Sequence, residues 1–454
     1  MAIATTMGSV TAVPTRRDFC CGVSALLFSR GGLLRAASLA AQVQSNQPAT
    51  ATRPDVAAID HDRILAAAAR YLAQPPTPIT SLRCARSPGS PHDYYSEAEP
   101  SALAEGESPA GPSAPAGSGS TAGSSSTAPA GSSSKPGASS TPPPFTAHRD
   151  ALFTLGLAVP ALAAAYLLTG DERYAEQAAL WLRAWFVDPA TRMTPRLDYG
   201  QVVPGQPASG SFAGILETLP LVEVAQSIPF LAALTPSDRL ALQAWFAAYL
   251  RWLTGTEDSG PRLSALARDR KDHHGTSWLL QASAYTLLTA PAGDRPISET
   301  TALDELRHRF RTVTLRAQIA ADGSFPHELT SPTPYRDSLF NLDMMAAVCQ
   351  LLSTRFESLW DYQLDDGPGM RSAIAFHFPF IADRTLWPFR ADAEHFDQLP
   401  ARRASLLFSA RAYRRTEYAA LWKTLPPDPP APGILRTLPI HQPLLWVRQP
   451  APLS

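Results

Sequence analysis

Two adjacent histidines, His273 and His274, form the sharpest chemical feature of the sequence. They follow a charged run at residues 268–272 and precede Gly275, where the pattern predicts the start of a helix. A helix N-terminus favours a bound anion and lowers the pKa of a histidine, so that a neutral imidazole can accept a proton. A solvated charge run in which one histidine caps the helix would give the same pattern, and composition alone leaves both interpretations open.

A second group of polar side chains lies in the loop at residues 321–338. It places Tyr335 beside Arg336, just before an apolar helical stripe. A nearby guanidinium can lower the pKa of a phenol enough for it to act as an acid or a base. The alternative is that the Tyr335 ring packs in the core while Arg336 pairs with Asp337, and the residues alone favour this alternative.

Other chemistries have less support. Adjacent histidines diverge on a helix, and no cysteine or histidine lies at a supporting spacing, so we expect no metal site. The sequence contains no P-loop and no nucleophile elbow. Paired carboxylates for glycoside hydrolysis could come from Asp272, Glu328 or Asp343, but the sequence gives no measure of their separation.

Helices have to position these groups, because from Phe145 onward apolar residues recur with the 3.6-residue period of an α-helix. Asp171 and Thr235, the latter followed by proline, are predicted helix N-caps. Similar tryptophan-containing segments at 181–186 and 244–250 suggest repeated helical hairpins. The sequence therefore predicts an all-α domain whose long loops carry the candidate site.

Composition limits the class of protein. Of the 454 residues, 45% are apolar, which is enough for a large core. The 39 basic and 40 acidic side chains nearly balance, so we expect no nucleic-acid partner, which would require a dense basic patch. We also expect no membrane-spanning helix. Four cysteines in a chain of this length exclude a disulfide scaffold.

Two segments differ from the rest in composition. Residues 1–41 place Arg16 and Arg17 before a short apolar run and small residues, which is typical of a twin-arginine export signal and predicts a periplasmic or secreted protein. Residues 101–144 consist mainly of Ser, Gly, Ala, Pro and Thr and are predicted to be a disordered insertion. One folded domain then spans residues 55–454, interrupted by this insertion.

Several segments together resemble the alginate lyase family of secreted bacterial polysaccharide lyases. The likeness covers nearly all of the chain after the leader, except the insertion. It is carried by short motifs at residues 91–97, 145–152, 167–175, 185–189, 321–326, 338–343 and 442–446. The resemblance implies an incomplete α/α toroid, a barrel of helical hairpins, in agreement with the all-α prediction.

The resemblance also implies roles for single residues. His274 matches the family's catalytic histidine and Tyr335 its catalytic tyrosine, so these two residues are the expected acid/base pair. His273 stands where the family has an asparagine that binds the substrate carboxylate. Ser331 stands where the family has an arginine, and Arg336 would have to replace it. His273 and Arg336 are therefore expected to neutralise the carboxylate.

Additional substrate contacts are expected from side chains in or beside these motifs. They are Arg270, His148, Arg149, Tyr95 and Glu328. His148 and Arg149 lie in the opening turn of a predicted helix, where a purely structural role is an equal alternative.

The implied activity is cleavage of an acidic, alginate-like polysaccharide by β-elimination, with no metal or organic cofactor. A uronate C5 proton becomes acidic enough for a protein base once the neighbouring carboxylate is neutralised. One alternative is a glycan-binding relative without activity, favoured by the altered asparagine and arginine positions and by the insertion, which replaces an aromatic stretch of the family. A glycoside hydrolase is the third. The sequence does not predict which polymer is cut or the oligomeric state.

Overall fold

The computed structural model describes residues 53–98, 143–203, 209–255, 262–290, 297–429 and 431–448. The predicted export signal, and all but the last two residues of the predicted insertion, lie outside this part of the chain. The described part consists mostly of helices, which confirms the all-α prediction. The helices of the first half are α2 (Val56–Ile59), α3 (His61–Tyr71), α5 (Ala147–Thr169), α6 (Glu172–Leu182), α7 (Leu221–Ser227), α8 (Pro236–Thr254), α9 (Arg262–Arg268), α10 (His273–Thr289) and α11 (Ile297–Arg309).

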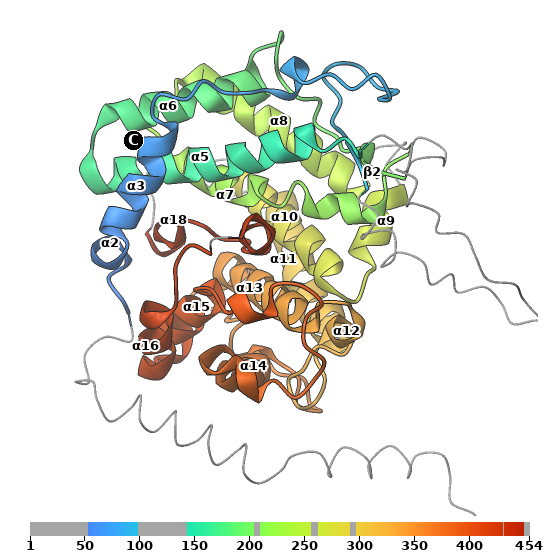
Figure 1. Cartoon of the computed structure of the whole chain (residues 1–454), viewed down its shortest axis with the longest axis vertical. Helices are drawn as coiled ribbons and strands as arrows, with labels where there is room; N and C mark the ends of the chain where they lie inside the picture. Colours follow the sequence, from blue (N-terminus) through green and yellow to red (C-terminus); the bar gives the residue numbers. More distant parts are fainter. Residues whose placement is uncertain are drawn as a thin grey trace, which may run out of the picture.

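The second half continues the same architecture. Its helices are α12 (Leu315–Gln318), α13 (Pro334–Leu352), α14 (Met370–Ala382), α15 (Ala404–Tyr413), α16 (Thr416–Thr424), α17 (Pro432–Leu435) and α18 (Pro443–Val447). In Figure 1, α3 and α5 to α8 lie in the upper part and α13 to α16 in the lower part. Helix α10 joins the two parts, since it packs against α7 and α8 and also against α13.

The helix starts follow from the residues that predicted them. Asp171 caps α6 by accepting a hydrogen bond from the backbone N–H of Arg173. Thr235 caps α8, and Asp238 bonds back to the cap residue, so that the two form a capping box. Gly255 ends α8 at a φ of 70°, in the left-handed region where glycine carries no steric cost.

Helix α5 bears on the expectation that no helix of the chain spans a membrane. Residues 151–170 contain no charged side chain, and α5 is long and apolar enough to cross a membrane, judged by length and composition alone. However, 67% of its most apolar window is buried inside the protein, where the helix packs against α3, α6 and α7. We therefore interpret α5 as a core helix of this domain.

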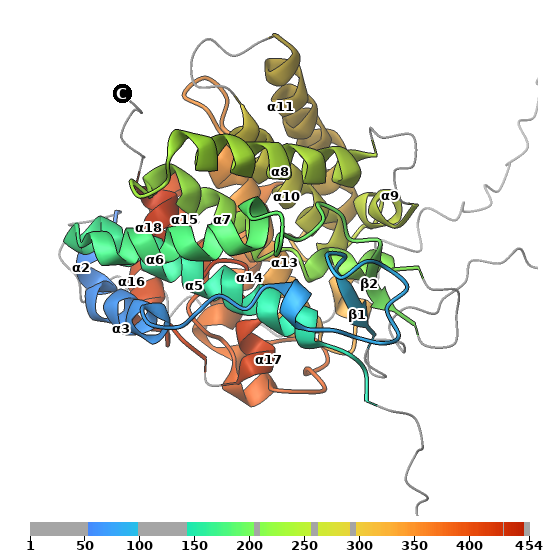
Figure 2. The same cartoon turned by 90° about the horizontal axis from the view of Figure 1, so that it is seen from above.

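A small parallel sheet lies at one edge of the helices. It consists of β1 (Tyr95–Glu97) and β2 (Tyr199–Val202), which Figure 2 shows side by side. Glu97 exchanges two hydrogen bonds with Phe145, one from each backbone N–H, at 2.9 and 2.8 Å. The chain therefore leaves the described part after β1 and re-enters it at almost the same point, which is how a domain accommodates an inserted segment.

Candidate active site

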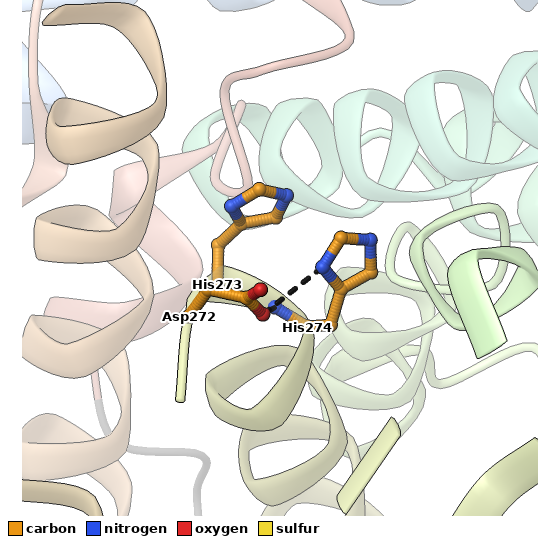
Figure 3. A group of neighbouring side chains, drawn as sticks. All are labelled: Asp272, His273 and His274. Atoms are coloured by element: carbon orange, nitrogen blue, oxygen red, sulfur yellow. Dashed lines mark hydrogen bonds and ion pairs between the residues drawn. The ribbon is translucent and has the colours of Figure 1, made fainter. Parts of the chain in front are cut away.

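The start of α10 fixes the position of the two histidines. Asp272 caps the helix, and its Oδ1 accepts a hydrogen bond from the backbone N–H of His274 at 3.0 Å. The preceding loop folds back over the first turn, so closely that a Cβ atom on Gly275 would lie 2.2 Å from the carbonyl oxygen of Arg270. Only glycine fits this approach. Both imidazoles then project from the same end of the helix (Figure 3).

The two imidazole rings lie side by side, with centroids 4.3 Å apart and planes tilted by 31°. Each ring bonds a carboxylate through Nδ1. His273 pairs with Glu328 Oε2 at 2.8 Å, and His274 pairs with Asp272 Oδ1 at 3.0 Å. Ionised carboxylates only accept hydrogen bonds, so both Nδ1 atoms carry hydrogen. In a neutral imidazole the second nitrogen, Nε2, is then the atom that accepts a proton.

Glu328 holds its histidine in place as part of a wider network. It lies in the short helix η6 (Glu328–Thr330) and also accepts the backbone N–H of His273 at 2.7 Å. Asn341 of α13 donates a further hydrogen bond to Oε1 of Glu328 at 2.9 Å and bonds Gln318 at 2.8 Å. Burial raises the pKa of this carboxyl group, and the three donors that converge on it act in the opposite direction by stabilising the ionised form.

The two histidines differ in charge at neutral pH. Burial disfavours charge on His273, but the surrounding carboxylates, Glu328 above all, outweigh burial and raise its pKa to about 9. Burial lowers the pKa of His274 to about 4, and the positive charge of His273 adds to this effect against the pull of Asp272. The site therefore holds one imidazolium and one neutral imidazole side by side.

Both histidines line a cavity of about 1040 Å³. Five arginines also line it, namely Arg149, Arg270, Arg336, Arg390 and Arg436. The carboxylates in its wall are Glu217, Glu223, Asp272, Glu328 and Asp337. All five carboxylates are at most 8% exposed, whereas the arginines are half-buried or exposed. The groups that a solute meets are therefore mainly cationic, which favours an anionic ligand.

Two of these arginines lie close to the histidines. Arg270 bonds Asp272 at 2.6 Å and stacks over the ring of Phe212, whose centroid lies 4.7 Å from the guanidinium carbon. The same Phe212 ring meets His274 edge-on at 5.1 Å. Arg336, at the start of α13, bonds Asp337 through Nε at 3.0 Å. Its remaining guanidinium N–H groups can bind a carboxylate in the cavity.

Most of the site residues predicted from the sequence line this cavity. Its wall includes His273, His274, Arg270, Arg336, Arg149 and Glu328. Tyr95 and His148 do not line it. Nδ1 of His148 accepts the backbone N–H of Tyr95 at 3.0 Å, and Nε2 donates to the carbonyl oxygen of Leu82. His148 thus connects β1 to α5. A structural role therefore explains this residue better than contact with a sugar.

Tyr335 requires a correction. Its side chain is completely buried, and the hydroxyl donates a hydrogen bond to the carbonyl oxygen of Phe380 at 2.8 Å. The ring packs edge-on against Trp387 and Phe396. Burial raises the pKa of this phenol further above its ordinary value. Because the hydroxyl is not part of the cavity wall, Tyr335 is a core residue here and not the partner of His274.

Several residues of the site escaped the sequence analysis. Asp272 was considered only as a hydrolase carboxylate, although an Asp before two histidines at a helix start also predicts a cap. Phe212, Arg390, Arg436 and His441 also line the cavity. They come from segments far apart in the sequence, and no local pattern marks them.

A metal site and a carboxylate pair were the competing chemistries. Asp272, His273 and His274 offer ligand atoms within 4.8 Å of one another. Both Nδ1 atoms are already hydrogen-bonded to carboxylates. The positive charge on His273 also disfavours a metal ion beside it. Asp343, proposed as a hydrolase carboxylate, is instead buried in an ion pair with Arg403 at 3.2 Å. The arrangement favours proton transfer by imidazole.

Comparisons with known proteins indicate the family and the fold of this chain. The family model for alginate lyase matches residues 80–387. The crystal structure of an alginate lyase from Bacteroides ovatus aligns with a TM-score of 0.64 and 22% identity, covering 92% of this chain and 98% of that chain. Alginate lyase A1-III from Sphingomonas species A1 aligns with a TM-score of 0.46 and 14% identity, covering 86% and 90%. A search of curated proteins gives no match.

The Bacteroides ovatus structure has the same fold, which confirms the predicted incomplete α/α toroid. The family model covers well over half of the chain. The residues that it matches include both histidines and the start of α13, which line part of the cavity. The chain thus belongs to the alginate lyase family of polysaccharide lyases.

Proposed function

We propose that this chain cleaves an alginate-like, uronate-containing polysaccharide by β-elimination. The observation that carries the proposal is the pair of adjacent imidazoles, each bonded to a carboxylate through Nδ1, at the wall of an arginine-lined cavity. β-Elimination requires a cation to stabilise charge on the uronate carboxylate and a neutral base to remove the C5 proton. His273 and His274 supply one of each.

His273 and Arg336 bind the uronate carboxylate. The imidazolium of His273 is fixed by Glu328, and the guanidinium of Arg336 extends from the start of α13. Both charges strengthen their interaction with the substrate as the C5 proton leaves and the negative charge on the carboxylate grows. This differential binding lowers the barrier, because the transition state is stabilised more than the bound substrate.

His274 is the base. Its Nδ1 donates to Asp272, so Nε2 takes the C5 proton. The electron pair of the C–H bond then forms the C4–C5 double bond, and the C4–O4 bond breaks. The leaving 4-oxygen takes a proton back from the His274 imidazolium. Burial keeps the pKa of His274 low, and a bound carboxylate would raise this pKa and so make the base stronger.

The test is formation of unsaturated product. Protein without residues 1–41 is incubated with a panel of uronic-acid polysaccharides, and the ultraviolet absorbance of the C4–C5 double bond is followed. We expect His274→Ala to abolish the signal and Tyr335→Phe to retain it. The matched control is His61→Ala, since His61 is an exposed histidine paired with Asp62. A folded protein that produces only saturated reducing ends would refute β-elimination.

The buried Tyr335 favours a second candidate. Since its hydroxyl bonds Phe380 and does not reach the cavity, the chain is also a candidate glycan-binding relative without turnover. In that case the cavity binds uronate oligosaccharides but no polymer yields unsaturated product. Calorimetric binding together with the absorbance assay separates the two candidates.

We also propose that the protein is exported to the periplasm or beyond, through the twin-arginine signal at residues 1–41. The support is the Arg16-Arg17 pair before a short apolar run. Replacing both arginines by lysine should retain the protein in the cytoplasm, as measured by cell fractionation. Equal export of both forms would contradict the proposal.

A further inference from the structure

The C-terminal segment forms one wall of the cavity, although it lies beyond the residues that the family model matches. Arg436 and His441 line the cavity together with Phe153 of α5. This wall is rigidly attached. The carboxylate of Glu223 in α7 accepts the backbone N–H groups of His441 and Gln442 at 2.7 and 3.0 Å. A surface that is already ordered binds a ligand at a lower entropic cost.

Arg436 is arranged to bind an anion in this wall. Its guanidinium carbon lies 4.6 Å from the centroid of the Phe153 ring, and one terminal nitrogen bonds Asp150 at 2.6 Å. The side chain is still 33% exposed. A guanidinium has five N–H donors and matches the geometry of a carboxylate. The contact with Phe153 and the bond to Asp150 together hold the guanidinium at the cavity wall.

The aromatic groups beside Arg436 suit the face of a sugar ring. His441 meets Phe153 edge-on, with centroids 5.9 Å apart. Burial lowers the pKa of His441 to about 3, so this imidazole is neutral and adds apolar surface to the wall. The combination of an aromatic surface with a fixed cation fits an acidic sugar better than a simple anion.

The cavity is also large enough for more than the reacting sugar. Its volume of about 1040 Å³ is at the upper end of the roughly 300–1,000 Å³ that hold a drug-sized ligand. The histidines come from the start of α10, whereas Arg436 and Phe153 come from the C-terminal segment and α5.

We infer that Arg436, Phe153 and His441 form a second uronate subsite, which binds the carboxylate of a sugar unit other than the one that reacts. The inference rests on the proposed function for the chemical class of the ligand. The cost of losing Arg436 should therefore depend on the length of the oligosaccharide. Arg436 also anchors the C-terminal segment through Asp150, and the test has to separate this structural contact from binding.

The experiment measures binding of saturated oligouronates, from disaccharide to hexasaccharide, by calorimetry. A His274→Ala background prevents turnover. Arg436→Gln should weaken binding of the longer oligosaccharides roughly tenfold and change disaccharide binding little. Asp150→Asn is the matched control. This variant breaks the same ion pair but keeps the Arg436 guanidinium, so it should retain the affinity. Thermal unfolding of each variant verifies the fold.

Three results would overturn the subsite. These are unchanged affinity in Arg436→Gln at every length, an equal loss at all lengths, or an equal loss in Asp150→Asn. Turnover by the protein with His274 intact is measured separately. If that protein yields no unsaturated product while Arg436→Gln still loses affinity for long oligosaccharides, β-elimination fails and the subsite stands.

Discussion

The charge on His273 depends on Glu328, and Glu328→Gln tests this dependence. The pKa of about 9, against an ordinary value of 6.5, corresponds to about 3 kcal/mol in favour of the imidazolium. Burial acts in the opposite direction, so the carboxylates together contribute more than this net value. Without the Glu328 charge, burial should lower the pKa of His273. At neutral pH a larger share of this residue would then be neutral.

Activity should follow this charge. Loss of a preorganised group that stabilises transition-state charge costs roughly 10²–10³ in kcat, and we expect Glu328→Gln to fall in this range. In the wild-type protein, activity should decline as the pH rises through about 9, where His273 loses its proton. Because the pKa is raised on folding, His273 stabilises the fold below about pH 6.5, and this stabilisation is lost as the pH rises through 9.

The assays are a pH profile of kcat/KM, nuclear magnetic resonance titration of the His273 ring, and unfolding by denaturant at several pH values. The control is Glu217→Gln, which removes another buried carboxylate of the same cavity. This carboxylate accepts hydrogen bonds from Tyr94 and Ser96 and does not bond either of the two histidines. The electrostatic argument is refuted if His273 in Glu328→Gln still titrates near pH 9. It is equally refuted if the ring becomes neutral and turnover is unchanged.

Three further variants test the framework of the site. Tyr335→Phe should retain activity but lower the free energy of unfolding by about 1 kcal/mol, because a buried hydrogen bond to Phe380 is lost. A large loss of kcat at unchanged stability would instead indicate that Tyr335 takes part in catalysis. Burial raises the pKa of Glu223 to about 7. The free energy of unfolding of the wild-type protein should therefore fall by about 3 kcal/mol as the pH rises from 4.5 through 7. Glu223→Gln should lack this fall when urea unfolding is compared at pH 5 and pH 8. Gly275→Ala should destabilise the protein by at least about 2 kcal/mol, because the new Cβ would clash with the carbonyl of Arg270. An unchanged melting temperature would contradict the conclusion that this position requires glycine.

Local signals predicted the elements well and the side-chain partners less well. The N-caps Asp171 and Thr235 act on backbone N–H groups within three residues, so sequence alone contains the whole interaction. The apolar run of α5 illustrates the limit. Its length and hydropathy allow either a membrane span or a core helix. Only contacts with helices distant in the sequence decide between them.

The pair of histidines shows the same limit in the candidate site. His273 and His274 were found because they are adjacent and lie at a helix start. The partner of His273, Glu328, is 55 residues away, and nothing in the sequence pairs the two. Tyr335 was assigned from a family motif, whereas its orientation depends on Phe380 of α14 and on Trp387, which follows that helix. A motif specifies the residue type but not the direction in which the side chain points.

The unequal charges of the two histidines follow from how their carboxylates are shared. Each imidazole bonds one carboxylate, so the pair alone gives no reason for a difference. Asp272, however, also bonds the guanidinium of Arg270 at 2.6 Å, and this positive charge lowers the pKa of His274 further. Glu328 bonds the ring and backbone of His273 and the neutral amide of Asn341. Its charge therefore acts mainly on His273, while burial, together with repulsion from the charged His273 ring 4.3 Å away, keeps the second imidazole neutral. Arg270 thus adds a smaller contribution to the difference between the two histidines, after burial and the charge of His273.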